Sequence, residues 1–345
     1  MSSGSPFQRH LKDLACAFAR PFFGGIGCII ALHRIVPEDQ LSPLRENRAL
    51  ELTPGALRAV LDWTRRRGLD VIRMDEVKQR LSDPRGAKFV VFTFDDGYRD
   101  NLTVALPIFR DFGMPLTVNV TTGFLDRNVS VWWYALEDIL ASRSALRIEW
   151  QGQPREWSWS TLDERERVFA EWAALIRAQN REGRDALVAA LCGEAGLDSM
   201  ACTDELMLDW AGAKELTTQW HGTVGAHSLS HCDLARLSED DLEAELIDAK
   251  ATIEARVGRV VKHLAYPFGG RGSVGRREFD LAREADYLTA VTTRTGNLFP
   301  DHAWHLQALP RLTLSGNYPP LSLLNRLESG LLAARANRWK RVVLE

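Results

Sequence analysis

Short apolar and β-branched runs alternate with helical patterns along most of this chain, and that alternation limits the folds open to it. The strand candidates are almost continuously apolar, which is typical of strands covered on both faces. They are Ile26–Leu32, Lys88–Phe94, Leu116–Val120, Thr223–Ala226, His263–Tyr266 and Leu288–Thr292. The helix candidates are Pro54–Arg67, Thr103–Phe112, Ser238–Val257 and Arg276–Ala285. The pattern predicts an α/β fold with a parallel sheet, open or closed into a barrel, and reactive residues at the carboxyl ends of its strands.

The stretch from about 130 to 215 breaks this alternation, because it is helical, charged and rich in tryptophan. The chain of 345 residues has 11 tryptophans, and 8 of them lie between Trp132 and Trp220. We interpret the stretch as an insertion or cap on the α/β domain. The tryptophans expected to form a small core within it are Trp157, Trp159 and Trp172.

Charge and cysteine usage narrow the class of protein. Lys and Arg total 43 against 46 Asp and Glu, a net charge of -3, so we expect no nucleic-acid partner. The five cysteines are odd in number and no two have CxxC spacing, which favours reduced thiols in a cytosolic protein. The sequence leaves the oligomeric state open.

The N-terminal segment resembles an export signal only in outline. Basic residues precede the apolar run Phe22–Leu32, but glycines interrupt the run and no small-residue cleavage site follows it. The run is also shorter than the roughly 20 residues that a membrane-spanning helix needs. We expect a buried strand in a cytoplasmic protein, with an uncleaved export or anchor signal as the alternative.

Both ends of the chain combine basic residues with aromatic ones, in Phe7–Phe23 and in Ala333–Arg341. This pattern is typical of a helix attached to an anionic membrane surface, and equally of a solvated helix with one packed face. Peripheral membrane association is therefore one of two expectations for the ends.

Two adjacent carboxylates, Asp95 and Asp96, follow the strand candidate Lys88–Phe94. They repel each other unless a cation or a shared proton compensates. Neighbouring side chains point in different directions along an extended chain, so one carboxylate can hold a metal while the other faces a substrate. A polar Asp-Gly turn is the simpler interpretation of the same residues.

Two histidines four residues apart offer a second part of such a site. On a helix, His227 and His231 would share one face with Cβ atoms about 5–6 Å apart, close enough to bind one divalent ion. The spacing matches the HExxH pattern, but Ser228 follows the first histidine and the usual glutamate base is missing. The aspartate pair would supply both a base and a further ligand. Cys232 is expected to be a core thiol, because an adjacent residue points away from the site.

Taken together, Thr93–Tyr98 and His227–His231 resemble the first two motifs of the polysaccharide deacetylases, the NodB-homology domain of carbohydrate esterase family 4. The resemblance implies a distorted parallel (β/α)7-type barrel over residues 26–315, interrupted by the Trp-rich insertion. An N-terminal helical extension would then occupy residues 1–25, and a basic helical tail residues 316–345.

The resemblance also implies roles for the motif residues. Asp95 would be the general base. The ligands of a divalent metal would be Asp96, His227 and His231. Zn²⁺ is the expected ion, and two imidazoles with one carboxylate also suit Co²⁺ or Ni²⁺.

The third motif of the family, usually Arg-x-Pro-Tyr-Gly, is matched by Ala265–Gly269. The aromatic whose backbone N–H helps form the oxyanion hole is Phe268 here. The family arginine that tunes the base is replaced by Ala265, and Arg311 is the candidate substitute. The residues expected on the substrate or oxyanion side are Tyr266, Pro267 and Phe268, with Trp132 and Trp133 from the insertion.

The general acid is expected near the start of the chain. The family's C-terminal Leu-x-His has no match after residue 300, whereas His33 follows the first strand candidate. This arrangement resembles permuted family members such as the enzymes that deacetylate poly-N-acetylglucosamine, and it implies that His33 protonates the leaving amine. Without the resemblance, a lone histidine there would be a satisfied core residue.

These assignments predict a hydrolase that removes N-acetyl groups from amino sugars, with an N-acetylated polysaccharide or lipid-linked glycan precursor as its partner. The alternatives are a catalytically weak carbohydrate-binding protein and a deformylase or O-deacetylase on the same scaffold. The glycine pattern Gly270–Gly275, with Arg294 about 20 residues on, resembles a dinucleotide-binding fingerprint. A glycine-rich loop that opens a helix explains the same pattern.

Overall fold

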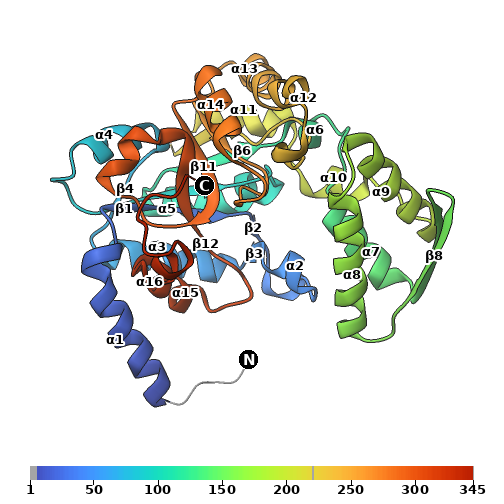
Figure 1. The fold of residues 1–345 in the computed structure, drawn as a ribbon, viewed down its shortest axis with the longest axis horizontal. Coiled ribbons are helices and arrows are strands. Elements are labelled where there is room, and N and C mark those ends of the chain that lie inside the picture. Colours follow the sequence, from blue (N-terminus) through green and yellow to red (C-terminus); the bar gives the residue numbers. More distant parts are fainter. Residues whose placement is uncertain (1–5, 220, 345) are drawn as a thin grey trace.

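The computed structural model describes residues 6–219 and 221–344. In this part of the chain seven parallel strands form a ring in the order β1-β12-β11-β10-β9-β6-β5, which pairing of β1 with β5 closes (Figure 1). The strands are β1 (Gly27–Leu32), β5 (Phe89–Phe94), β6 (Leu116–Val120), β9 (Gly222–Ala226), β10 (His263–Ala265), β11 (Thr289–Thr295) and β12 (Leu309–Thr313). A short strand, β4 (Asp70–Val71), pairs with β5 outside the ring. The fold is the expected distorted (β/α)7-type barrel.

Six of the barrel strands were predicted, and their ends differ from the predictions by up to three residues. The seventh, β12, was not predicted, because its sequence Leu-Pro-Arg-Leu-Thr carries a proline and a charged residue in only five positions. It pairs with both β11 and β1 and so completes the barrel.

The four predicted helices lie outside the barrel. Two are regular, α3 (Pro54–Arg66) and α14 (Arg276–Glu284). The others contain π-helical turns: η3 (Asn101–Ala105) leads into α5 (Leu106–Phe112), and η5 (Ala244–Asp248) separates α12 (Glu239–Glu243) from α13 (Ala249–Val257). The helices begin and end at residues that commonly cap helices. The Thr53 side chain caps α3 by accepting from the Ala56 N–H, and Gly258 ends α13 with a φ of 71°.

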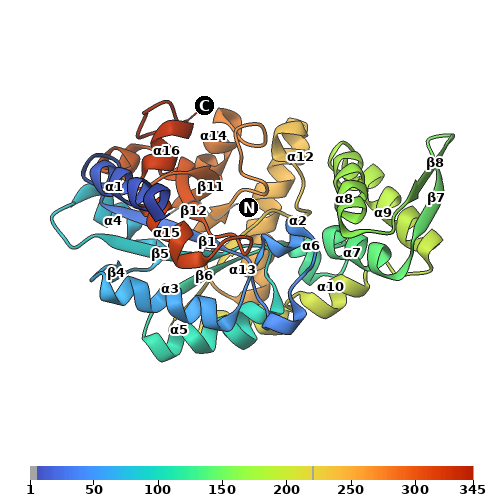
Figure 2. The same cartoon turned by 90° about the horizontal axis from the view of Figure 1, so that it is seen from below.

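The helices between β6 and β9 are α6 (Thr122–Leu125), α7 (Trp132–Ser142), α8 (Leu162–Arg177), α9 (Arg181–Ala195), α10 (Ala201–Leu206) and α11 (Trp210–Thr218). Much of this part of the chain, from α7 to α10, projects from one side of the barrel, whereas α11 packs against β9 and α13 (Figure 2). An antiparallel hairpin of β7 (Ala145–Trp150) and β8 (Gln153–Ser158) was not expected in a stretch predicted as helical. Trp157 and Trp159 pack edge-on against Trp172, with ring centroids 5.5 and 5.6 Å apart, as the small-core interpretation expects. Trp220 lies outside the described residues.

A short segment with its own pair of strands follows β1 at the carboxyl end of the barrel. Strands β2 (Arg34–Ile35) and β3 (Glu51–Leu52) pair, with α2 (Arg45–Arg48) between them. Asn47 donates to the Trp133 carbonyl oxygen at 2.9 Å, which joins this segment to α7. The remaining short elements are α4 (Val77–Ser82) and the 3₁₀ turns 38–40, 74–76, 234–236, 300–304 and 306–308.

The two ends of the described chain pack together. Helix α1 (Pro6–Phe23) lies beside α15 (Pro320–Glu328) and α16 (Leu331–Ala336) in both views. The buried Glu328 carboxylate accepts from Arg20 and Arg67 at 2.9 Å and from Lys88 at 2.6 Å, so it joins α15 to α1, α3 and the start of β5. No helix in the described part of the chain is long and apolar enough to cross a membrane.

Candidate active site

The carboxyl ends of the barrel strands bring most of the predicted site residues around one pocket. His33 follows β1, Asp95 and Asp96 follow β5, and His227 follows β9. The pocket is also lined by His231, Tyr266, Phe268, Trp132 and Trp133. Pro267 is not part of the lining, and Arg311 reaches Asp95 from β12.

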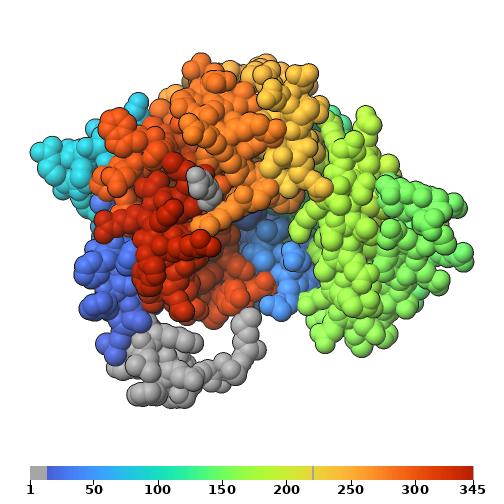
Figure 3. Space-filling model, in the orientation of Figure 1, coloured from blue at the N-terminus to red at the C-terminus, as the bar shows by residue number. Residues whose placement is uncertain are grey.

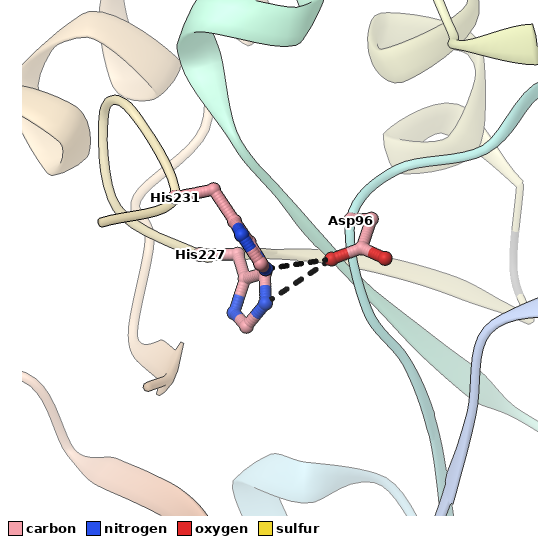
Figure 4. A group of neighbouring side chains, drawn as sticks. All are labelled: Asp96, His227 and His231. Atoms are coloured by element: carbon pink, nitrogen blue, oxygen red, sulfur yellow. Dashed lines mark ion pairs between the residues drawn. The ribbon is translucent and has the colours of Figure 1, made fainter. Parts of the chain in front are cut away.

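Asp96, His227 and His231 form a compact group of potential metal ligands (Figure 4). Asp96 Oδ1 lies 3.3 Å from Nε2 of each histidine. His227 Nδ1 lies 2.7 Å from the Ala265 carbonyl oxygen, which can only accept, so the neutral ring keeps its lone pair on Nε2, facing Asp96. A backbone carbonyl that fixes the tautomer in this way is a common partner of metal-binding histidines.

The expectation that the two histidines share a helical face is wrong. His227 directly follows β9, with its N–H bonded to the Val120 carbonyl at 2.8 Å, and the chain then turns through a loop. Ser228 and His231 have positive φ values of 64° and 54°. The Ser228 hydroxyl accepts from the His231 N–H at 3.0 Å and closes the turn. A turn thus brings together the two rings that four-residue spacing on a helix would also have brought together.

Two buried charged residues hold this loop from outside the pocket. Glu245 in η5 accepts from the N–H groups of Leu229 and Ser230, both at 2.9 Å. Arg184 on α9 donates to the Ser230 carbonyl at 2.7 Å. Since non-glycine residues with positive φ store strain, fixed partners on both sides are needed to keep the loop in this shape.

Asp95 is held by two neighbouring side chains. Arg311 donates to its two oxygens at 2.9 and 2.6 Å, and Asn119 on β6 donates to Oδ1 at 2.9 Å. The Arg311 Nε donates in turn to the Thr292 carbonyl at 2.9 Å, and the whole side chain is buried. The candidate substitute for the missing third-motif arginine therefore contacts the candidate base directly.

The two carboxylates stay ionised despite their burial. Burial raises the pKa of Asp95, but the charge and hydrogen bonds of Arg311 outweigh it and hold the pKa below its ordinary value. Burial likewise raises the pKa of Asp96, and the two imidazoles of His227 and His231 beside its carboxylate more than reverse this. One carboxylate can therefore act as a ligand and the other as a proton acceptor near neutral pH.

The three histidines respond differently to the same surroundings. Burial lowers the pKa of His33 and of His231, and Asp96 only partly opposes it. Burial also lowers the pKa of His227, but Asp95 and Asp96 together raise it above its ordinary value. The His33 carbonyl accepts from Asn101 Nδ2 at 2.7 Å, which fixes its backbone at the end of β1.

The residues of the third motif differ in how they contribute to the pocket. Phe268 has a φ of 59°, and its ring lies 5.1 Å from that of His231. The Tyr266 hydroxyl donates to the Gln307 carbonyl at 2.9 Å, so only the rest of this buried side chain is available to the pocket. The Pro267 carbonyl accepts from the Gly269 N–H at 2.6 Å within the turn.

The insertion forms one wall of the pocket. Trp133 donates from Nε1 to the Tyr98 hydroxyl at 2.9 Å and lies 5.3 Å from the His231 ring. The guanidinium of Arg177 lies 5.5 Å from the ring of Trp132 and 5.8 Å from that of Phe268. Arg177 was not predicted, because in the sequence it is one of many charged residues on α8.

Other residues were also missed or excluded by their contacts. Asn119 was not predicted as a site residue, although an amide in a buried strand could have suggested an inward-facing hydrogen-bond partner. Cys232 is buried against Ser230 and Arg184 and is not part of the ligand group. Arg294 donates to the carbonyls of Val274 and Val343, so it is engaged with the backbone rather than free for a nucleotide phosphate.

Known proteins resemble both the sequence and the fold. The sequence model of one family, described as polysaccharide deacetylase, matches residues 82–166 and 199–290, just over half of the chain. A search of curated protein sequences found no match.

Solved structures of low sequence identity share the fold. The deacetylase PplD of Streptococcus pyogenes, solved with acetate, has 20% identity and a TM-score of 0.53, covering 87% of this chain and 96% of that one. IcaB from Ammonifex degensii has 14% identity and a TM-score of 0.52, with 87% and 97% covered. A de-N-acetylase from Aggregatibacter actinomycetemcomitans has 13% identity and a TM-score of 0.52, with 87% and 99% covered.

Proposed function

The chain belongs to the polysaccharide deacetylase family, and on that premise we propose that it is a metal-dependent hydrolase that removes N-acetyl groups from amino sugars. The substrate would be a polysaccharide or a lipid-linked glycan precursor. The observation that carries the proposal is the division of the adjacent carboxylates, since Asp96 faces two imidazoles while Asp95 is held by Arg311 at the same pocket.

The donor set supports a divalent metal. Asp96 Oδ1 is buried without a hydrogen-bond partner among the described residues, and both its neighbours are imidazole nitrogens. A buried carboxylate oxygen in that position is costly unless a cation balances it. Two nitrogens and one oxygen suit Zn²⁺, and also Co²⁺ or Ni²⁺. When bound there, such an ion would supply acidification of water and polarisation of an amide carbonyl.

Asp95 is proposed as the general base. Its lowered pKa keeps it ionised, and Arg311 and Asn119 fix its orientation, so one carboxylate oxygen can take a proton from the attacking water. The proposed oxyanion donor is the backbone N–H of Phe268, in the turn that follows β10.

His33 is proposed as the general acid. When an amide is hydrolysed, its nitrogen leaves as an amine only after it is protonated, so a proton donor must face that nitrogen. His33 lines the pocket on the side of β1, and the lowering of its pKa by burial makes its protonated form a stronger acid. The same shift reduces the fraction of the ring that is charged at neutral pH, so a proton must reach it during each cycle.

Metal analysis combined with product analysis tests the proposal. The purified protein should bind about one equivalent of divalent metal and release acetate from N-acetylglucosamine oligomers. Asp95→Asn should abolish release while the metal stays bound, and Asp96→Asn should lose both. Formate from N-formyl sugars, or acetate from O-acetyl xylan alone, would instead assign a deformylase or an O-deacetylase. Bound metal with no release from any glycan, and unchanged glycan binding by Asp95→Asn, would indicate a binding protein.

A further inference from the structure

Helix α1 exposes an apolar stripe. Leu14, Phe18 and Phe22 recur every four residues and therefore lie on one face of the helix. All three are more than half exposed, Phe18 the most at 78%, and the rings of Phe18 and Phe22 lie 6.0 Å apart. Large apolar side chains grouped in this way on a soluble surface usually mark a contact with another body.

The other face of α1 is already occupied. Ala19 is buried, and Arg20 donates to Glu328 at 2.9 Å, so the helix is fixed on the barrel with its stripe turned outward. The stripe is therefore not the core-facing side of a loosely placed helix.

A second group of residues, from the opposite end of the sequence, lies at the end of α1. The ring of Trp339 lies 5.6 Å from that of Phe23, at the end of α1, and Trp339 is 59% exposed. Figure 3 shows the blue surface of α1 next to the red surface of the C-terminal helices. The exposed cations beside Trp339 are Arg335, Arg338, Lys340 and Arg341.

Within the part of the chain that the structure describes, no carboxylate pairs with the cations of this group. Among the described residues, Arg335, Arg338 and Lys340 form no ion pair, and Arg341 lies over the Phe299 ring at 5.2 Å. The carboxylate that ties the two ends together, Glu328, is buried and already bound by three cations. Exposed aromatic and apolar side chains thus stand beside uncompensated positive charge.

We propose that this terminal face, made of Leu14, Phe18, Phe22 and Trp339 with the four neighbouring cations, binds the surface of an anionic phospholipid bilayer. Phenylalanine and tryptophan insert at the boundary between headgroups and acyl chains, and arginine and lysine are drawn to anionic headgroups. Two segments that each carried an ambiguous basic-aromatic pattern form one surface in the fold, which favours the membrane interpretation over that of two separately solvated helices.

A second copy of the chain fits this face less well. Two-fold contact would place the same patch on both sides of the interface. The four cations of one copy would then face or border those of the other, and like charges brought together in an interface oppose association. Anionic lipid supplies the complementary charge that a second copy lacks.

Vesicle co-sedimentation of the full chain tests this proposal without relying on its activity. The protein should bind vesicles of phosphatidylcholine mixed with phosphatidylglycerol, bind phosphatidylcholine alone weakly, and dissociate as salt is raised. Phe18→Ser with Phe22→Ser, and separately Arg338→Glu with Lys340→Glu, should each reduce binding by about tenfold or more. Deacetylation of a soluble glycan should stay unchanged in both variants, because none of these residues lines the pocket.

Matched controls separate this face from general surface effects. Val260→Ser removes an exposed apolar side chain elsewhere, and Arg276→Glu reverses an exposed charge on α14; both should bind vesicles as the unmodified protein does. Thermal unfolding of every variant checks that the fold is kept. Equal vesicle binding by all variants, or no binding to anionic vesicles, would overturn the proposal. So would a dimer that the Phe18 and Phe22 changes dissociate in the absence of lipid binding.

Discussion

Arg311 donates from both terminal nitrogens to Asp95, across the intervening strand β1, with distances of 2.9 and 2.6 Å. Both side chains are buried, so the pair is shielded from solvent and salt. The family motif places an arginine beside the base from the strand that here carries Ala265, whereas in this chain an arginine reaches the same carboxylate from β12. A change at Arg311 should therefore act on the proposed base and leave the proposed metal ligands in place.

Arg311→Met should shift the pH dependence of deacetylation. Removing the guanidinium removes the charge that lowers the pKa of Asp95, while burial, which raises it, remains. The acidic limb of the kcat/KM profile should move to higher pH by about one to three units, and metal content should not change. Arg294→Met is the matched control, because Arg294 is also buried but donates only to backbone carbonyls. An unshifted acidic limb would show that Arg311 does not tune the base.

The same pair should make stability depend on pH. Asp95 has a folded-state pKa below its unfolded value, so its stabilising contribution is present above the unfolded pKa and is lost as pH falls through the folded one. Urea denaturation should show that Arg311→Met costs about 3 to 5 kcal/mol at neutral pH. The difference from the unmodified protein should shrink below about pH 4. A constant difference across that range would contradict the linkage.

Glu245→Gln should weaken metal binding although Glu245 is not one of the proposed metal ligands. The carboxylate holds two N–H groups of the loop between the histidines, and a neutral amide holds them less strongly. Outer partners of this kind typically change metal affinity by about 10- to 100-fold. Competition with a chelator measures the change. Glu254→Gln is the control, since Glu254 accepts from the Val261 N–H away from the pocket; an equal loss in both variants would point to general destabilisation.

His33→Ala should lower kcat far more than it raises KM. A general acid acts on the leaving group in the transition state, and its removal typically costs about 10²- to 10⁴-fold. Steady-state kinetics on an acetamide substrate should show this loss, and an activated O-acetyl ester, whose leaving group needs no protonation, should be hydrolysed almost as before. Comparable losses on both substrates would assign His33 a structural role.

Trp172→Ala should destabilise the insertion. The ring is fully buried between Trp157 and Trp159, and replacing such a side chain with alanine typically costs about 3–5 kcal/mol. Urea denaturation followed by circular dichroism measures the loss. Trp304→Ala changes an exposed tryptophan and should stay within about 0.5 kcal/mol of the unmodified protein. A similar small effect at Trp172 would show that the three rings do not form a core.

The sequence predicted the barrel and the chemistry-bearing pairs because their signals are local. Asp95 and Asp96 directly follow an apolar strand, and the spacing of His227 and His231 is visible in five letters. The same spacing was wrongly placed on a helix, because a turn with positive φ at a serine and a histidine has no distinctive sequence signal. Local pattern thus identified the residues but not the backbone that positions them.

What could not be predicted depends on contacts between distant segments. Strand β12 was missed because an arginine in a short run weakens the strand pattern, yet that arginine is buried with Asp95 and the Thr292 carbonyl as its acceptors. Arg184 and Glu245 look like ordinary helix charges until the fold places them against one loop. In each case a charged side chain that would oppose burial by itself has a hydrogen-bond partner at a distant position in the sequence.

The direction of β1 affects which part of a glycan the pocket can bind. Helix α1 precedes the amino end of this strand and His33 follows its carboxyl end, so six extended residues separate them by about 20 Å. In both views α1 and the insertion that walls the pocket lie on opposite sides of the barrel. If α1 binds lipid, the pocket would face the aqueous side of the protein. The enzyme would then remove acetyl groups along the outer part of a membrane-attached glycan, rather than from the sugar nearest to the membrane.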